Sequence, residues 1–175
     1  DDGRMTVTVD GVPFEPEPFA PPWRREDFAA VLDQLGAQVD TYPVFNGTGA
    51  NVVGLQAMLP RWGAVIAATT AHINVDEGGA PEKLAGLKLF VVPTVEGKLT
   101  PEAITAAVPD RAGDVHWAQP RVLSVAQSTE LGTVYTPDEL RALAEYAHER
   151  DWLLHIDGSR LANAAASLGT DLRAI

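Results

Sequence analysis

The stretch that decides the fold lies near the end of the chain and reads Leu153-Leu154-His155-Ile156-Asp157-Gly158-Ser159-Arg160-Leu161-Ala162-Asn163. Apolar residues lead into an aspartate and a glycine, and an arginine then opens an alanine-rich helical pattern. This order predicts a buried strand that delivers the Asp157 carboxylate at its carboxyl end, where open α/β sheets bind their ligands. An acid and a base three residues apart can hold two ends of one small molecule. Asp157 and Arg160 are equally typical of a pair that caps the next helix.

A second stretch, far upstream, reads Asn46-Gly47-Thr48-Gly49-Ala50-Asn51. It follows residues 41–45, whose β-branched and aromatic composition predicts a short strand, and it precedes a helical pattern over 52–62. Gly47 and Gly49 leave backbone amides uncovered, Thr48 adds a hydroxyl, and a helix start contributes partial positive charge. The turn is therefore a candidate anion site, although it matches neither the Walker loop nor the three-glycine dinucleotide motif. A plain turn with a capping side chain is the alternative.

The composition excludes several classes of function. The formal charge of −11, from 13 Lys and Arg against 24 Asp and Glu, repels phosphate backbones, so we expect no nucleic-acid partner. The absence of cysteine excludes disulfides, thiol catalysis and thiolate metal sites. The four histidines share no metal-ligand spacing on a common helix, so we expect no metal site.

The length and hydropathy of the chain indicate one globular unit. The 175 residues are enough for one sizeable hydrophobic core and too few for two domains of ordinary size. The sequence has no apolar run long enough to cross a bilayer and no secretory leader, so we expect no membrane partner and a cytoplasmic protein.

Strand and helix patterns alternate at least four times along the chain, with strands expected at 64–68, 87–92, 121–127 and 152–156. This alternation predicts an α/β fold, a mostly parallel sheet with helices on both faces. Residues 1–40 read as an irregular lead-in with at most an edge strand at 5–9 and one helix at 25–35, and residues 78–81 read as loop. Thr136-Pro137-Asp138-Glu139 predicts a capped helix start.

The polar candidates all follow predicted strands. His72 comes after the 64–68 strand, Glu130 after the 121–127 strand, and Asp157 and Arg160 after the 152–156 strand. Because parallel strands end at the same edge of a sheet, these residues and the glycine turn can share one edge. A lone histidine is more often structural, so His72 is a candidate only in this context.

With these residues assembled, the chain from about residue 42 to 175 resembles the threonine aldolase branch of the pyridoxal-phosphate enzymes, within the aspartate-aminotransferase-like fold (fold type I). The resemblance rests on three motifs, Phe45-Asn46-Gly47-Thr48-Gly49-Ala50-Asn51, Ala71-His72-Ile73 and His155-Ile156-Asp157-Gly158-Ser159-Arg160-Leu161-Ala162-Asn163-Ala164. It implies that the chain is part of the large domain of that fold, and that the intact protein is a homo-oligomer, a dimer or a tetramer.

The resemblance also implies a role for each candidate residue. Gly47 and Thr48 would hold the phosphate of pyridoxal 5'-phosphate, and Asp157 would pair with its pyridine nitrogen. His72 would lie against the ring face and assist proton transfer at the β-hydroxyl of the substrate. Arg160 would take the amino acid's α-carboxylate in a two-point contact that lysine cannot reproduce. The implied reaction is the cleavage of threonine, or another β-hydroxy-α-amino acid, to glycine and an aldehyde.

The chain departs from the family in the position of its lysines. The Schiff-base lysine of the family lies beyond the last helix, and Lys83, Lys88 and Lys98 match no such motif. We therefore expect residues 41–175 to form an incomplete cofactor-binding large domain, without a C-terminal small domain and inactive alone. Many relatives place a histidine at the position of Glu130, so a general acid–base role for Glu130 is a hypothesis.

Two alternatives remain open. The chain could belong to another fold type I enzyme, a β-eliminating lyase or an aminotransferase, because these enzymes share the aspartate and the phosphate turn. It could also be a non-catalytic α/β module that binds a phosphate metabolite, since the sequence shows no Schiff-base lysine.

Overall fold

The computed structural model describes residues 7–9, 12–14, 40 and 42–175. The chain divides into two units, residues 1–41 and 42–175. In the first unit, β1 (Val7–Val9) pairs antiparallel with β2 (Val12–Phe14). The strand expected at 5–9 is confirmed where it is described, whereas β2 was not predicted, although the dipeptide at 10–11 is Asp-Gly, a common hairpin connection. The helix expected at 25–35 lies outside the described residues.

A parallel sheet organises the second unit, and its strand order is β4-β3-β5-β6. The strands are β3 (Gly63–Ala68), β4 (Lys88–Val92), β5 (Gln119–Ala126) and β6 (Leu153–Asp157). The four strands predicted from the alternating pattern are therefore confirmed, with their ends shifted by one or two residues. β3 and β5 lie in the middle of the sheet, and β6 lies at one edge.

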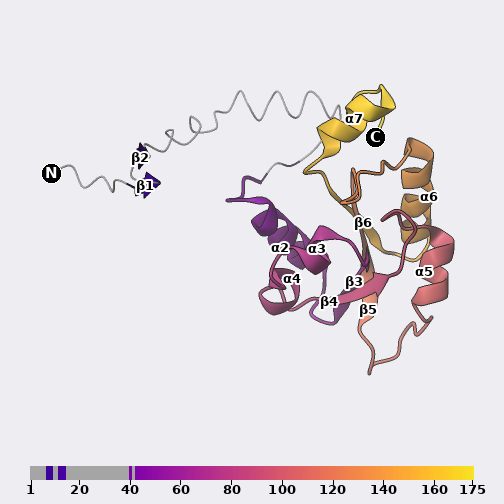
Figure 1. Ribbon diagram of the computed structural model, residues 1–175. Helices are drawn as coiled ribbons and strands as arrows, with labels where there is room; N and C mark the ends of the chain where they lie inside the picture. The colour runs from indigo at the N-terminus through magenta and orange to yellow at the C-terminus, as the bar shows by residue number, and fades with distance from the viewer. Residues whose placement is uncertain (1–6, 10–11, 15–39, 41) are drawn as a thin grey trace. The chain divides into compact units, whose positions relative to one another are not determined.

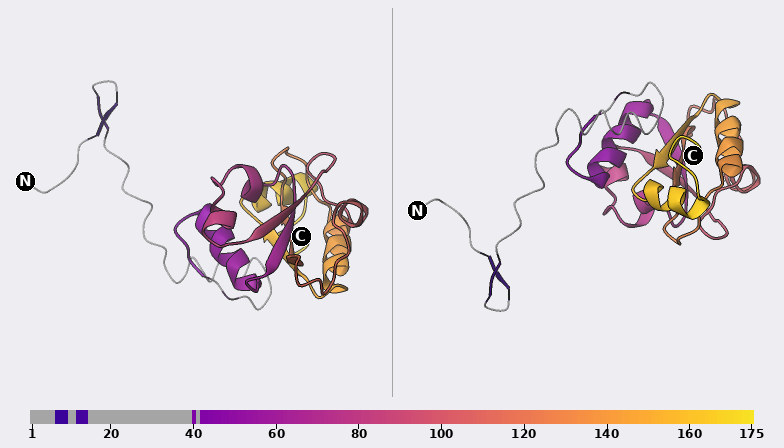
Figure 2. Two further views of the ribbon diagram at one scale, coloured as in Figure 1. Left: turned by 90° about the horizontal axis from the view of Figure 1, so that it is seen from below. Right: turned by 90° about the horizontal axis from the view of Figure 1, so that it is seen from above.

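Helices cover both faces of this sheet, as predicted (Figures 1 and 2). On one face lie α2 (Gly47–Met58), α3 (His72–Val75) and α4 (Ala80–Lys83). On the other lie α5 (Pro101–Ala107) and α6 (Pro137–His148), and α7 (Leu161–Leu168) follows β6. No helix in the described part of the chain is long and apolar enough to cross a membrane.

The core forms where the helices meet the central strands. β3 is buried at every position because both of its faces are covered, which explains its continuous apolar sequence. Leu55 of α2 packs from one side, and Leu140 and Leu143 of α6 pack from the other. Full burial of each such side chain stabilises the fold by about 1.5–3 kcal/mol.

The predicted start of α6 is confirmed in detail. The Thr136 side chain accepts a hydrogen bond from the Glu139 amide, and the Glu139 side chain accepts one from the Thr136 amide. Pro137 occupies the first turn, where a missing amide hydrogen costs no helical hydrogen bond.

Three sequence predictions about local structure are wrong. No strand forms over residues 42–45, which have no paired strand beside them. The helix expected at 52–62 runs from Gly47 to Met58, because the Asn46 side chain caps it earlier and Pro60 follows its end. The loop expected at 78–81 includes Ala80 and Pro81, the first two residues of α4, where a proline is tolerated.

Candidate active site at the carboxyl edge of the sheet

The candidate residues converge at the carboxyl edge of the sheet. His72 begins α3 shortly after β3, Glu130 follows β5, and Asp157 is the last residue of β6. Since the strands are parallel, the segments after them meet at one edge. The first turns of α2 lie at the same edge, because Asn51 of α2 is hydrogen-bonded to Asp157.

Asp157 is held by two donors that reach its two oxygens. Its Oδ1 accepts from the backbone amide of Ser159 at 3.0 Å, and its Oδ2 accepts from the Asn51 amide at 3.1 Å. Partial burial by itself raises the pKa of Asp157, but these hydrogen bonds and the nearby His155 outweigh it and keep the pKa below its usual range. The carboxylate is therefore ionised at neutral pH.

The helix-capping interpretation of the Asp157/Arg160 pair does not apply to α7. The N-cap residue of α7 is Arg160, and no side chain caps this helix end. The Asp157 side chain instead bonds to the amide two residues later, in a turn that precedes the helix. The aspartate is thus not used to start the helix.

Asn51 joins two carboxyl groups through one amide nitrogen. Its Nδ2 donates to Glu77 Oε1 at 2.8 Å and to Asp157 Oδ2 at 3.1 Å. Asn51 is only 5% exposed. Its orientation is fixed chemically, because a flipped amide would turn its oxygen toward two acceptors.

His72 is the first residue of α3 and contacts the loop after β5. Its backbone amide donates to Glu130 Oε1 at 3.0 Å. Its imidazole is half-exposed, with Nδ1 3.8 Å from Asp76 Oδ2 and Nε2 3.7 Å from Glu77 Oε1. These distances are longer than hydrogen bonds, so neither ring nitrogen is hydrogen-bonded to another described residue, and a ligand can reach the ring.

Arg160 is oriented by the same loop. Its Nε donates to the Ser128 carbonyl at 3.0 Å, and its Nη2 lies 3.3 Å from Glu130 Oε1. A guanidinium carries five N–H donors, so this arrangement leaves donors for a further anion. Glu130 Oε1 thereby links Arg160 to the backbone at His72.

Gly47 and Thr48 form the first turn of α2. Asn46 caps this helix by accepting from the Gly49 amide at 2.8 Å, while the first amides of a helix have no partner within it. A side chain at Gly47 would meet no atom of the described residues within 4 Å, so these residues leave the helix end open. Thr48 precedes Asn51 by three residues, which places it about 4.5 Å along the helix axis from the contact with Asp157.

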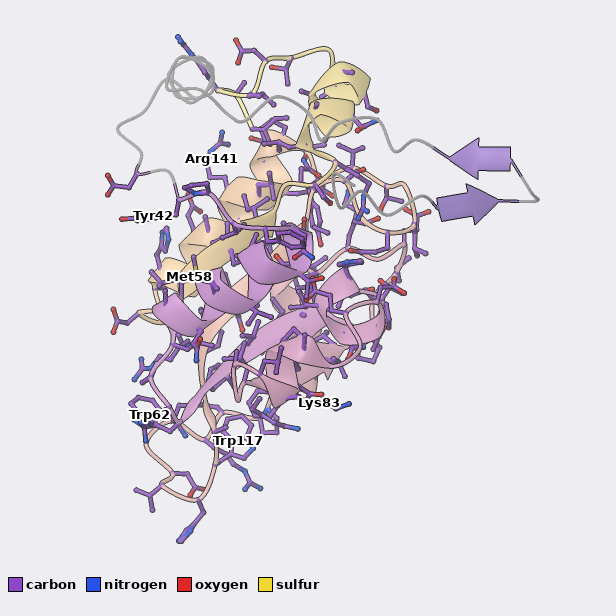
Figure 3. The ribbon with its side chains drawn as sticks, turned by 90° about the vertical axis from the view of Figure 1, so that its left-hand side faces the viewer. Tyr42, Met58, Trp62, Lys83, Trp117 and Arg141 are labelled. Carbon is purple, nitrogen blue, oxygen red and sulfur yellow. The ribbon has the colours of Figure 1, made fainter. Side chains whose placement is uncertain are left out.

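One cavity in the described part of the chain lies elsewhere. It has a volume of about 450 Å³ and lies near the amino ends of β5 and β6, with Arg121 and Trp152 in its lining. Figure 3 shows the neighbouring Trp62 and Trp117 at the end of the molecule opposite α7. We place the candidate site at the carboxyl edge instead, because an ionised carboxylate, an arginine and an open helix start converge there.

The model of one protein family matches most of the chain. It is the family described as beta-eliminating lyase, and the match covers residues 26–175. The chain belongs to the beta-eliminating lyase family.

Within this family the chain is similar to threonine aldolases. It is 42% identical over 147 residues to the low specificity L-threonine aldolase of Pseudomonas aeruginosa, covering 83% of this chain and 42% of that protein. It is 29% identical over 151 residues to the low specificity L-threonine aldolase of Escherichia coli K12, covering 86% of this chain and 44% of that protein. The chain thus spans about two fifths of the length of the curated relatives it matches.

Solved structures agree with this membership. The threonine aldolase of Leishmania major superposes with a TM-score of 0.68 at 33% identity, covering 74% of this chain and 38% of that chain. A putative L-allo-threonine aldolase of Listeria monocytogenes superposes with a TM-score of 0.64 at 19% identity, covering 83% and 39%, which shows the shared fold. The resemblance to threonine aldolases and the predicted fold class are therefore confirmed.

The sequence patterns did not indicate two members of this candidate site. The structure brings His72, Asp157 and Arg160 to one edge, with Gly47 and Thr48 at the helix end beside it; their roles stay predictions. Asn51 was part of a quoted motif but received no role, and Glu77 received no attention at all. Glu77 stands between Asp76 and two glycines, a pattern typical of an exposed loop. The sequence therefore does not indicate that its side chain is buried.

Proposed function

We propose that the protein carrying this chain is a pyridoxal-phosphate-dependent aldolase that cleaves threonine, or related β-hydroxy-α-amino acids, to glycine and an aldehyde. One observation carries the proposal. The ionised Asp157 carboxylate accepts hydrogen bonds from Ser159 and from Asn51, which places it close to the start of α2. Arg160 lies in the same turn after β6 and donates to the loop after β5. The named relatives support the choice of substrate.

The donor set fits pyridoxal phosphate. The Asp157 carboxylate is charged and only half-buried, as a partner of a protonated pyridine nitrogen must be. The open first turn of α2 offers the Gly47 and Thr48 amides and the Thr48 hydroxyl to a phosphate. When bound, the cofactor supplies the sink for the electrons released at the substrate's α-carbon.

Arg160 would bind and orient the amino acid. Its guanidinium is fixed by the Ser128 carbonyl and Glu130 and keeps donors for an α-carboxylate. A two-point contact sets the direction of the bonds at the α-carbon, and so selects which bond breaks. We assign Glu130 to holding Arg160, because its Oε1 already accepts from two donors.

His72 would handle the proton of the β-hydroxyl. Cleavage of the bond between the α- and β-carbons requires that proton to leave as the aldehyde carbonyl forms. The half-exposed imidazole has two nitrogens without hydrogen bonds in the described part of the chain, and in its neutral form the nitrogen that carries no hydrogen can accept the proton. A proton added at the α-carbon then completes glycine.

Another fold type I reaction is the second candidate. The family description itself names β-elimination, and the cofactor-bound C-S lyase of Staphylococcus hominis shares the fold with a TM-score of 0.55 at 12% identity. A β-eliminating lyase or an aminotransferase would use the same aspartate and phosphate turn. The substrate, rather than the cofactor, therefore separates these candidates.

The remaining parts of the proposal concern the intact protein. We propose that it is a cytoplasmic homo-oligomer, a dimer or a tetramer, and that residues 41–175 form part of its large domain. The edge strand β6 leaves Leu153 and Ile156 exposed, which supports a covering subunit or a further segment beside it. That this stretch alone lacks aldolase activity stays a prediction.

A substrate screen tests the proposed function. The protein that carries this chain is saturated with pyridoxal phosphate. Separate reactions then contain L-threonine, L-allo-threonine, L-cysteine, or L-alanine plus a 2-oxo acid. We expect equal amounts of glycine and acetaldehyde from the two threonines. Pyruvate from cysteine, or exchange of the amino group, with no glycine formed, would assign the second candidate. Binding of phosphate compounds without turnover of any amino acid would favour the non-catalytic alternative.

A further inference from the structure

A buried carboxyl group lies behind the residues expected to contact the cofactor. The Glu77 side chain, two residues after α3, is fully buried. Its Oε1 accepts from Asn51 at 2.8 Å, whereas its Oε2 is buried without a hydrogen-bond partner among the described residues. One of the two carboxyl oxygens is thus unused.

Such a group is not explained by stability. Burying a carboxyl group with one oxygen unsatisfied is unfavourable compared with an apolar side chain of similar size. Buried polar atoms without partners are uncommon in folded proteins, and each one needs an explanation. Polar groups that weaken the fold locally are expected where function requires them.

The position of Glu77 suggests what it does. Through Asn51 it is connected to Asp157, and its Oε1 lies 3.7 Å from His72 Nε2. Glu77 is therefore linked to Asp157, which is expected at the pyridine nitrogen of the cofactor, and lies beside His72, which is expected at the face of the pyridine ring.

We propose that Glu77 is a positioning residue, which acts through Asn51 to hold Asp157 in place for the pyridine nitrogen of the cofactor. This role of Glu77 rests on the proposed cofactor role of Asp157.

The asparagine needs a second anchor to do this work. The terminal torsion of an asparagine side chain is broad, so one hydrogen bond at 3.1 Å to Asp157 leaves the amide free to rotate. The shorter bond to Glu77 uses the other N–H and removes that freedom. Outer partners of this kind orient the groups that contact a cofactor.

A matched pair of substitutions tests the proposal in the full-length protein. Glu77→Met and Glu77→Gln are both neutral and similar in size, and only glutamine keeps an acceptor for Asn51. Glu82→Gln, at an exposed position of α4, is the control for the loss of one negative charge. We expect Glu77→Met to release pyridoxal phosphate at least about tenfold faster than Glu77→Gln. The melting temperature of the cofactor-free Met variant should not be lower than that of the Gln variant.

A second measurement does not depend on the cofactor. The carboxyl group of Asp157 is titrated by NMR in the cofactor-free variants. Its pKa should be higher in Glu77→Met than in Glu77→Gln, because methionine cannot accept the hydrogen bond that anchors Asn51 toward Asp157. Equal pKa values for Asp157, or equal release of the cofactor, would overturn the positioning role even if the protein cleaves threonine. A protein that binds no pyridoxal phosphate would instead overturn the proposed function, while the titration would still decide the role of Glu77.

Discussion

Asp157 keeps its charge because donors from two distant parts of the sequence meet at its oxygens. The Ser159 amide is local, whereas Asn51 lies 106 positions away in sequence. The apolar run before Asp157 predicts that this residue ends a strand. No local pattern indicates that Asn51 is its partner. The identity of single candidates was thus predictable, and the partners that set their chemistry were not.

Replacing Asp157 should change how stability depends on pH. The folded pKa of Asp157 is lowered, so its charge stabilises the fold above the unfolded pKa of about 3.9, and that contribution is lost as the pH falls through the lower folded value. In urea unfolding, wild type should exceed Asp157→Asn in free energy of unfolding above about pH 5, and the difference should shrink below about pH 4. A difference that grows as the pH falls would show that burial, which raises the pKa, outweighs the hydrogen bonds.

Arg160→Lys should weaken substrate binding more than folding. Lysine keeps one positive charge but cannot contact the Ser128 carbonyl, Glu130 and a substrate carboxylate together. Steady-state kinetics should give a KM for threonine at least about tenfold higher, equivalent to about 1.4 kcal/mol of binding. Arg141→Lys on the exposed side of α6 is the matched control and should leave KM unchanged. Unchanged KM in both variants would remove Arg160 from the substrate site.

At the helix ends, local chemistry decided which predictions succeeded. The α6 start was predictable because its capping box lies within four consecutive residues, Thr136 to Glu139. The strand expected at 41–45 was wrong where described, because strand-like composition does not supply a paired neighbour. The single-turn helices α3 and α4 are too short to produce a periodic signal.

Two cap deletions separate stability from cofactor binding. Asn46→Ala and Thr136→Ala each remove the side chain that caps a helix, at the starts of α2 and α6. Each should lower the free energy of unfolding by about 1 kcal/mol. Only Asn46→Ala should also weaken the binding of pyridoxal phosphate, because it loosens the turn that contains Gly47 and Thr48. Equal cofactor affinity in the two variants, measured by fluorescence titration, would contradict phosphate binding at α2.

In residues 42–175, the alternation of strands and helices along the sequence was sufficient to predict the fold class. Parallel strands with helices on both faces follow from the spacing of apolar segments. The strand order β4-β3-β5-β6 did not follow, because each crossover can return on either side of the sheet. The same limit applies to the Asn51–Glu77 contact, which spans 26 residues and depends on how α2 and α3 pack.

In the proposed function, Asp157 is the residue on which pyridoxal phosphate binding and threonine cleavage at this site depend. The most direct test measures glycine formed from L-threonine by the full-length protein and by its Asp157→Asn variant, each saturated with pyridoxal phosphate. We predict cofactor-dependent glycine formation by the wild type and a loss of about 100-fold or more in the variant. Equal rates in the two proteins, or no glycine from the wild type, would contradict the claim.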